Sequence, residues 1–363
     1  MLNITLKILF IIFFLSSNLL AVINSDVLTS YEMEDYIKEK LIYKKKVDDI
    51  TFKLNTKYRD KCSTKKKIMG LRLISKKEIN KVLSAGGGAG LFNKVKKNNY
   101  KAYSNLIGDI SNNQTRVLYT ITNTDAEVNG VEEGSEIISI DGKKNFNIPN
   151  ILNSSKKEIE LKINSSKGIN DIKIKLYESC DLNIYILSTL NKEISFFRSN
   201  NRLFITDGLL EYIKNDDELV MLISNEFYHY INNHASIQVK LMEISKKTSG
   251  GAGKILAPIG GIWLTAANYG SNLMQKIKFK YDKKKEDAAD FASIQITKLL
   301  NYDPFLAKRF WERLVKEKPP LSYISNFRNV DSQKIRTIDN AVDYKTINFP
   351  NLKEYNIFKK KFR

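Results

Sequence analysis

Three residues of this chain, Asn225, Glu226 and His229, are spaced for metal chemistry if they lie on a helix. They read N-E-x-x-H, which differs from the zinc-protease pattern H-E-x-x-H at its first position. In the intact pattern two imidazoles four residues apart share a helical face and bind one zinc ion, while the glutamate acts as general base on the zinc-bound water. Here Asn225 replaces one imidazole, and a histidine on a helix is otherwise more often an ordinary core residue.

The segment around these residues must be a helix to position them, and its pattern predicts one from Asp216 to Lys240. Asp216 or Asp217 can cap its start, and Glu218 can lie in the first turn, where a negative charge interacts favourably with the helix dipole. Apolar residues recur at helical spacing, which predicts that the helix is buried. These residues are Leu219, Leu222, Ile223, Phe227, Tyr230 and Ile231.

A second pattern lies downstream, where Glu286, Ala289 and Asp290 form E-x-x-A-D in another apolar segment with helical character. Glu286 could be a third metal ligand. Asp290, one turn further on, could accept a hydrogen bond from a ligand histidine. Two patterns in this order favour a metal site over a chance match to either one.

These motifs resemble the gluzincin metallopeptidases of the CAAX prenyl protease and bacterial heat-shock membrane protease type, peptidase family M48. The resemblance covers roughly residues 200 to 340 and includes a strand that runs into T-x-G-L-L. His234 matches a histidine that is frequent in the family but is not a ligand. The matching residues are Phe204–Leu210, Asp217–Leu219, Asn225–His229, His234, Glu286–Asp290, Asn301–Pro304 and Phe310–Trp311.

The resemblance implies zinc as the cofactor and hydrolysis of peptide bonds by zinc-activated water. Position by position, it makes His229 and Glu286 metal ligands and Glu226 the general base. It makes Asp290 a residue that does not bind the metal itself but accepts a hydrogen bond from a ligand histidine. Asn225 stands at the degenerate position where the first ligand histidine belongs.

The asparagine weakens the expected zinc site, because its neutral carbonyl oxygen suits harder cations than zinc. If ~10 to 16 kcal/mol of zinc binding is shared among four ligands, losing one costs roughly 3 to 4 kcal/mol, or about two to three decades in affinity. The family also often carries a histidine-proline-serine segment followed by an arginine, whereas residues 327–335 read FRNVDSQKI. We therefore expect weak zinc binding and impaired activity.

The first 21 residues have the layout of a secretory signal peptide, with one lysine, an apolar run and a small residue at the end. The run is short for a stable membrane span, and an uncleaved N-terminal anchor is the alternative. Export would place the protein in the periplasm or at a membrane. In an oxidising compartment Cys62 and Cys180, the only two cysteines, can form one disulfide, although two separate buried thiols would also fit.

The chain is strongly basic, with 59 Lys and Arg against 40 Asp and Glu and a formal net charge of +19. In a cytosolic protein such an excess would suggest nucleic acid as a partner. For an exported protein we expect an anionic membrane surface and no nucleic acid. Solvated charges in a lysine-rich composition explain the excess equally well.

The part of the chain before residue 181 predicts two further regions. Apolar residues at steps of three and four between 28 and 58 predict one or two amphipathic helices in an N-terminal helical region, 22–80.

Alternating runs then predict strands at 116–122, 136–142, 158–164 and 171–178. Asp125–Gly142 resembles a segment of PDZ domains, with Ser135 in place of the usual Asp. A PDZ-like domain over 81–180 should bury Val117, Tyr119, Ile137 and Ile140 on one side.

Two glycine-rich stretches have competing interpretations. A PDZ domain captures a peptide carboxylate with backbone amides, and Gly90, Leu91 and Phe92 could form that peptide-binding loop, although a flexible linker explains these glycines as well. The apolar stretch 249–273 precedes a run of lysines. It predicts a lid over the cleft or an interfacial segment next to lipid, or else a mobile loop.

The predicted fold class is therefore α+β. N-terminal helices and a small β-rich PDZ-like domain precede a mainly helical gluzincin-type domain at 181–345, with a helix near Ser332–Val342 and a basic, irregular tail at 346–363. The predicted function is that of an exported metalloendopeptidase-family protein with impaired activity toward unfolded or extended polypeptides. A non-catalytic peptide-binding or chaperone-like pseudopeptidase and a basic membrane-surface scaffold are the alternatives.

Overall fold

A computed structural model describes residues 30–75, 105–106, 108, 114–188, 194–199, 201–234, 264–265, 283–319, 330, 332–345 and 348–362. The predicted signal peptide at 1–21, the predicted glycine loop at 86–92 with Gly90, Leu91 and Phe92, and nearly all of 249–273 lie outside the described residues. The predictions made for those segments therefore remain predictions.

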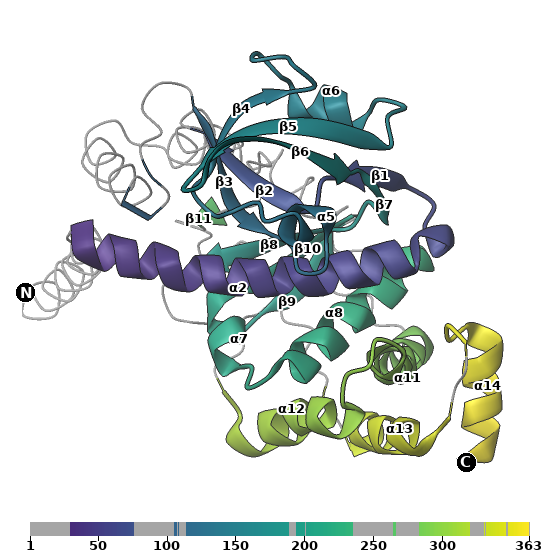
Figure 1. Ribbon diagram of the computed structural model, residues 1–363. Coiled ribbons are helices and arrows are strands. Elements are labelled where there is room, and N and C mark those ends of the chain that lie inside the picture. Colours follow the sequence, from purple (N-terminus) through teal and green to yellow (C-terminus); the bar gives the residue numbers. More distant parts are fainter. Residues whose placement is uncertain are drawn as a thin grey trace, which may run out of the picture.

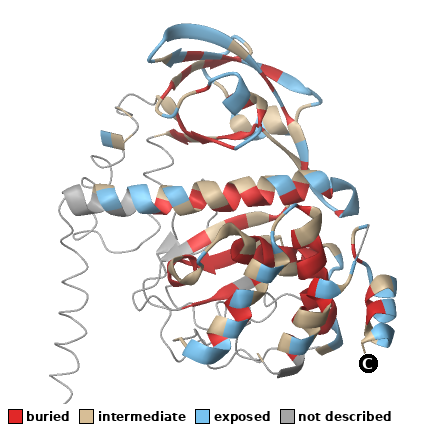
Figure 2. Ribbon diagram, turned by 60° about the horizontal axis from the view of Figure 1, so that its bottom comes forward, coloured by how far each residue is buried: buried red, intermediate tan, exposed pale blue. Residues whose placement is uncertain are grey.

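One long helix, α2 (Ser30–Lys57), lies between an upper β-layer and a lower layer of helices and strands (Figure 1). It fulfils the prediction for residues 28–58 as a single helix. Its middle turns carry most of its buried residues, because both layers pack against them (Figure 2). The helix therefore belongs to the cores on both of its sides.

The upper layer is a five-stranded sheet in the order β2-β3-β4-β5-β6, and every neighbouring pair is antiparallel. Its strands are β2 (Leu71–Ser75), β3 (Thr115–Thr120), β4 (Glu136–Ile140), β5 (Glu158–Ser165) and β6 (Gly168–Lys175). Two short helices, α5 (Asp125–Val128) and α6 (Ile148–Leu152), join its strands. Strict alternation buries Ile159, Leu161 and Ile163 on one face of β5, as its sequence predicts.

Two strand predictions need correction. The strand predicted for 171–178 is interrupted, because β6 ends at Lys175 and β7 (Tyr177–Cys180) pairs with β1 (Lys65–Ile68) in a separate two-stranded sheet. The predicted N-terminal helical region also contains strands, since β1 and β2 follow α2. Their pairing partners lie far along the chain, and local periodicity carries no information about such partners.

The four residues predicted to be buried in this sheet are all buried. Val117, Ile137 and Ile140 share one apolar cluster. Tyr119 is outside that cluster, and its hydroxyl instead donates to Asp48 Oδ2 of α2 over 2.6 Å. The sheet is thus held to α2 by a polar contact as well as by apolar packing.

The lower layer combines a four-stranded sheet, in the order β11-β8-β10-β9, with a set of helices. Its strands are β8 (Asn183–Ser188), β9 (Phe196–Ser199), β10 (Arg202–Thr206) and β11 (Leu264–Thr265). Its helices are α7 (Asp207–Tyr212), α8 (Asp216–Ile231), α11 (Lys283–Leu299), α12 (Pro304–Glu317), α13 (Ser332–Asp343) and α14 (Leu352–Lys361). None of the described helices is both long and apolar enough to cross a membrane.

The C-terminal tail is helical where we predicted irregular chain. Asn351 caps α14 by accepting a hydrogen bond from the Glu354 amide over 3.0 Å. Tyr355 and Phe358 are buried, and the Phe358 ring stacks on Phe291 of α11 with centroids 4.4 Å apart. The lysine-rich composition concealed this amphipathic pattern.

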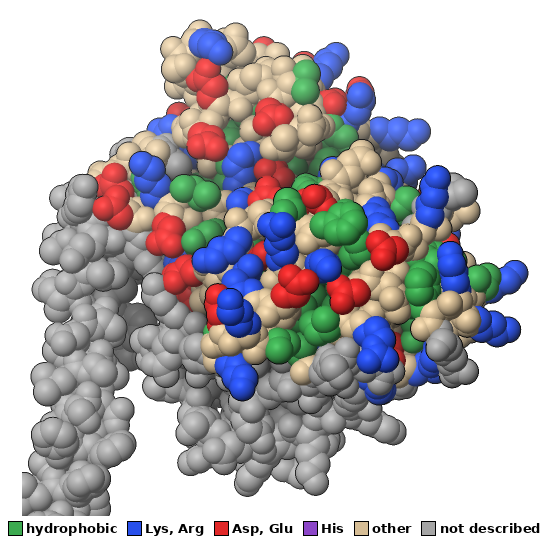
Figure 3. All heavy atoms as spheres, turned by 90° about the horizontal axis from the view of Figure 1, so that it is seen from below, with side chains coloured by type: hydrophobic (Ala, Val, Ile, Leu, Met, Phe, Trp, Pro, Cys, Tyr) green, Lys and Arg blue, Asp and Glu red, His purple; other side chains and the backbone are tan. Residues whose placement is uncertain are grey.

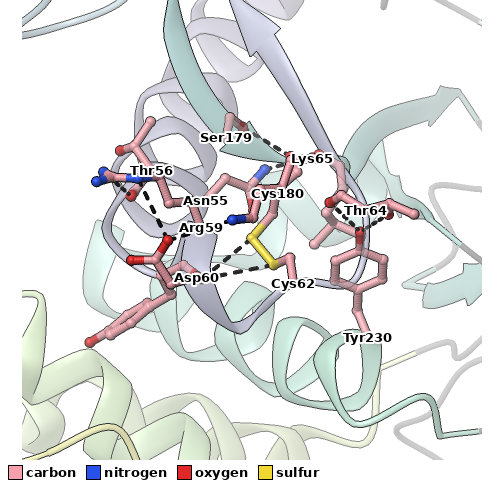
Figure 4. The surroundings of a disulfide bond; sticks show 12 residues. Asn55, Thr56, Arg59, Asp60, Cys62, Thr64, Lys65, Ser179, Cys180 and Tyr230 are labelled. Atoms are coloured by element: carbon pink, nitrogen blue, oxygen red, sulfur yellow. Dashed lines mark hydrogen bonds and ion pairs between the residues drawn. A yellow bond between two sulfur atoms is a disulfide. The ribbon is translucent and has the colours of Figure 1, made fainter.

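A disulfide joins Cys62, directly after the 3₁₀ turn η1 (Arg59–Lys61), to Cys180 at the end of β7 (Figure 4). The two cysteines are 118 residues apart in sequence. Closing such a long loop in the unfolded chain contributes about 4 to 5 kcal/mol in the chain-entropy model. Beside the disulfide, the Thr64 and Tyr230 hydroxyls lie 2.8 Å apart and connect this junction to α8.

A buried carboxylate, Asp48, holds α2 against the upper sheet. Its oxygens pair with Lys44 one turn earlier on α2 and, over 2.6 Å, with Arg72 of β2. Burial opposes ionisation of Asp48, but the two cations and their hydrogen bonds outweigh burial and lower its pKa. Burial also lowers the pKa of Lys44, to about 8. Asp48 and Lys44 are therefore costly to bury without their partners, whereas the Arg72 side chain is 43% exposed.

Replacing Asp48 by asparagine should destabilise the protein by about 3 to 5 kcal/mol, because it leaves two cations without their shared anion. Chemical unfolding of the purified protein measures the change. Asp60→Asn, at an exposed carboxylate, is the matched control and should leave the unfolding midpoint unchanged. Because the folded-state pKa of Asp48 is depressed, its contribution should be complete above about pH 4 and decline at lower pH. An Asp48→Asn protein as stable as the parent at neutral pH contradicts this account.

Candidate functional site

Helix α8 carries the predicted site, and Asn215 caps its start. The Asn215 side chain accepts a hydrogen bond from the Glu218 amide over 2.9 Å. The prediction that Asp216 or Asp217 is the cap was wrong, because both already lie in the first helical turn. Glu218 is fixed there by Arg313 of α12, whose Nη1 and Nη2 donate to its two oxygens over 2.8 and 2.6 Å.

The helix ends at Ile231, well before the predicted Lys240. Asn233 adopts a left-handed conformation with φ 51°. The amides of Asn233 and His234 donate back to the carbonyls of Tyr230 and His229 over 3.2 and 3.0 Å, which is the Schellman arrangement. This turn returns His234 to the helix, so that its Nδ1 lies 2.9 Å from His229 Nδ1.

Helix α11 packs directly against α8 and supplies the acidic residues of the second motif. Glu286 and Asp290 are four residues apart and share a face. The C-terminal end of α11 is tied to its neighbours, because Lys53 of α2 donates to the Leu300 carbonyl over 2.6 Å. Gln295 likewise donates to the Ala341 carbonyl of α13 over 2.6 Å. Helix α11 is thus tied to α2 and α13 while it packs on α8.

Four of the five residues predicted for the metal site meet in two pairs between α8 and α11. His229 Nε2 lies 3.5 Å from Glu286 Oε2, so the two expected ligands face each other. Asn225 Nδ2 donates to Asp290 Oδ1 over 3.0 Å. Asp290 therefore does accept a hydrogen bond from the first position of the motif, but from an amide in place of an imidazole. Glu226 is buried on the same helix.

Two cations complete the cluster, and the motifs did not predict either of them. Arg198 of β9 places its Nε 3.5 Å from Glu226 Oε2. Lys334 of α13 donates to both oxygens of Asp290 over 2.6 and 2.7 Å. The sequence could have indicated a partner for Lys334. A lysine in the first turn of a helix interacts unfavourably with the helix dipole, so a nearby carboxylate is expected to compensate. Arg198 lies in a short alternating segment that carries no motif.

The charges of the cluster shift the pKa values of its two histidines in opposite directions. Burial lowers the pKa of His229, but the hydrogen bond and charge of Glu286, with the charge of Glu226, outweigh burial and raise it. For His234, burial first and then the charge of His229 lower the pKa to about 4. The Glu286 pKa is lowered, because the effect of His229 exceeds that of burial. The contact between His229 and Glu286 therefore favours the protonated imidazole and the ionised carboxylate.

The donor set does not fit a catalytic zinc centre, which takes three protein ligands and a water. His229 and Glu286 are ligands of the right kind and face each other. Asn225 donates its amide nitrogen to Asp290, and its other polar atom is a neutral carbonyl oxygen, which suits harder cations than zinc. Within the described residues no three His, Cys, Asp or Glu side chains form a group that could hold a metal ion. A metal ion would also have to replace the direct contact between His229 and Glu286.

Comparison with known families gives one match. Residues 183–337 match the family model of Peptidase family M48, from β8 through most of α13. The members of this family are zinc metallopeptidases, and the match supports a metallopeptidase-type function for this part of the chain. A search of curated proteins finds no match to this chain.

The two histidines should titrate far apart in the metal-free protein. They are the only histidines of the chain, so imidazole NMR signals can follow both across pH. His229 should titrate above its ordinary value of 6.5, because its protonated form faces Glu286, and His234 should titrate near 4. Two titration curves with midpoints near pH 6.5 would show that His229 and Glu286 do not pair in solution.

His234→Gln is the matched control, since it leaves one imidazole and assigns the signals. Because the folded-state pKa of His229 is raised, its pair with Glu286 contributes stability below about pH 6.5 that is lost as the pH rises through the folded-state value. The free energy of unfolding of the His234→Gln protein should therefore fall over that window.

Proposed function

We propose that this protein is a metalloendopeptidase-type protein with weakened zinc binding and, as a consequence, impaired hydrolysis of peptide bonds. One observation carries the proposal: Asn225, at the place of the first ligand, donates its amide to Asp290 and provides no imidazole. The family match over residues 183–337 supports the peptidase type. The donor set of one imidazole and one carboxylate supports the weakened metal binding.

The arrangement also explains why the site keeps its shape without the first histidine. In an intact motif the outer nitrogen of that histidine would donate to the carboxylate behind it. The Asn225 amide makes the same donation to Asp290 over 3.0 Å. Asparagine thus preserves the link between the helices while it removes the group that binds zinc.

A non-catalytic peptide-binding function is the second candidate, and the edge of the lower sheet favours it. Strand β9 pairs only with β10 among the described strands, and Arg198 of β9 contacts Glu226 of the site. An open strand edge can bind an extended polypeptide through backbone hydrogen bonds. Unfolded or extended chains are therefore the proposed partners, whether or not they are cleaved.

We further propose that the upper sheet is a PDZ-like unit. Support comes from the segment 125–142, in which α5 buries Ala126 and the following turn needs Gly130 and Gly134 at φ 73° and 80°. These positive φ angles give a physical reason for the glycines of the motif. The proposed peptide-binding loop with Gly90, Leu91 and Phe92 lies outside the described residues.

Export to an oxidising compartment is also a proposal. The Cys62–Cys180 disulfide supports it, because disulfides persist in such compartments. A basic membrane-surface scaffold has less support. On the face seen in Figure 3, Lys and Arg side chains intermingle with Asp and Glu, and a patch of one sign would favour an anionic membrane more strongly.

The experiment that tests the main proposal is Asn225→His in the purified protein. One ring nitrogen of the new histidine can donate to Asp290 as the amide does, and the other is free to bind zinc. Zinc affinity should rise by about two to three decades, toward one ion per chain. The variant should cleave an unfolded protein such as casein, and the unaltered protein should do so poorly.

Two further variants separate the outcomes. Asn225→Ala removes the amide without adding a ligand and should gain neither zinc nor activity. Glu226→Gln added to Asn225→His should keep the metal and lose the cleavage, because the general base is gone. An unaltered protein that already holds stoichiometric zinc and cleaves at family-like rates refutes the impaired function. An Asn225→His protein that binds no zinc favours the peptide-binding candidate.

A further inference from the structure

The acidic side chains of the candidate site each lie beside a basic side chain of the same chain. Glu286 lies 3.5 Å from His229 Nε2, and Asp290 lies 2.6 Å from Lys334 Nζ. Glu226 lies 3.5 Å from Arg198 Nε. Glu226 stands at the position of the general base. In a zinc peptidase the general base lies beside a dication, whereas here Glu226 lies beside Arg198.

Arg198 is held in place by its strand. It lies on β9, opposite Leu203 of β10, and two residues after the buried Phe196, so both side chains leave the strand on the same face. Its side chain is only 6% exposed. Its Nη2 donates to the His234 carbonyl over 2.6 Å, in the turn that ends α8. The guanidinium therefore connects Glu226 with the end of the helix that carries it.

We infer that Arg198 is a built-in counter-ion that provides, beside Glu226, the positive charge that a metal ion provides in a zinc peptidase. This inference rests on the proposed function. A buried carboxylate without a nearby cation is strongly unfavourable, and an arginine is charged at every physiological pH. Arg198 thus positions Glu226 and keeps the cluster of α8 and α11 folded without metal. The same fixed charge repels a dication that approaches His229 and Glu286.

The inference makes Arg198 a second obstacle to zinc, independent of Asn225. Restoring the ligand at position 225 leaves the guanidinium in place. Removing the guanidinium leaves the ligand set incomplete. The two changes should therefore each raise zinc affinity, and together they should raise it more than either alone.

The test uses Arg198→Gln in the full protein, with thermal unfolding and zinc titration as readouts. After chelator treatment, the melting temperature should lie roughly 5 to 10 °C below that of the parent, because Glu226 has lost its cation. Zinc affinity should rise by roughly tenfold or more, both in the parent and in the Asn225→His background. Zinc should restore part of the lost melting temperature in Arg198→Gln and raise that of the parent little.

Three control variants keep the test decisive. Arg202→Gln removes the same charge from the neighbouring strand β10, and Arg198→Lys keeps the charge at the site. Both should stay closer to the parent in zinc affinity. Arg198→Gln combined with Glu226→Gln should be more stable than Arg198→Gln alone, because the buried charge that Arg198 pairs with is then gone. If Arg198→Gln does not fold, recovery of the fold in this double variant supports the pairing, and failure of the double variant to fold overturns it.

The results distinguish this inference from the proposed function. Tight stoichiometric zinc in the unaltered protein overturns both. Weak zinc in the unaltered protein, together with an Arg198→Gln protein of unchanged melting temperature and unchanged zinc affinity, overturns the role of Arg198 and leaves the proposed function standing.

Discussion

Burial of several carboxylates in one small volume is the constraint on which the lower half of this protein depends. Glu226 and Asp290 are almost completely buried between α8 and its neighbours, and Glu286 is close to them. Carboxylates in such a place repel one another and lose their hydration, so they are stable only with cations at hand. Arg198 from β9 and Lys334 from α13 meet that need from two different elements. The sheet and the last helices are therefore fixed around the pair α8 and α11 by charge as well as by apolar packing.

The same principle operates at the junction of the two layers. Asp48 lies on α2 and pairs with Arg72 of the upper sheet, while Lys53 of the same helix donates to the Leu300 carbonyl at the end of α11. One helix thus connects the upper sheet to the helix that carries Glu286. The Cys62–Cys180 disulfide fastens the region just beyond the end of α2 to β7. The position of the candidate site is set by elements that contain no catalytic motif.

The geometry separates two properties that an intact zinc motif combines. One is the mechanical link between the helices, which here is the Asn225 amide bonded to Asp290. The other is the capacity to bind zinc, for which a neutral asparagine oxygen is a poorer ligand than an imidazole. A single substitution can therefore remove metal affinity and leave the packing of α8 on α11 intact.

The sequence by itself determined the local features. Motif spacing identified Asn225, Glu226, His229, Glu286 and Asp290, apolar periodicity located α2, α8 and α11, and alternation located most of the strands of the upper sheet. These features depend on residues close together in the chain, which is why pattern reading finds them. Tertiary structure decided the rest. Strand β7 left one sheet for another, and the lysine-rich tail became α14 by packing on Phe291. Arg198 and Lys334 joined the site only because folding brought β9 and α13 to it, and a salt bridge between distant residues has no periodic signature in the sequence.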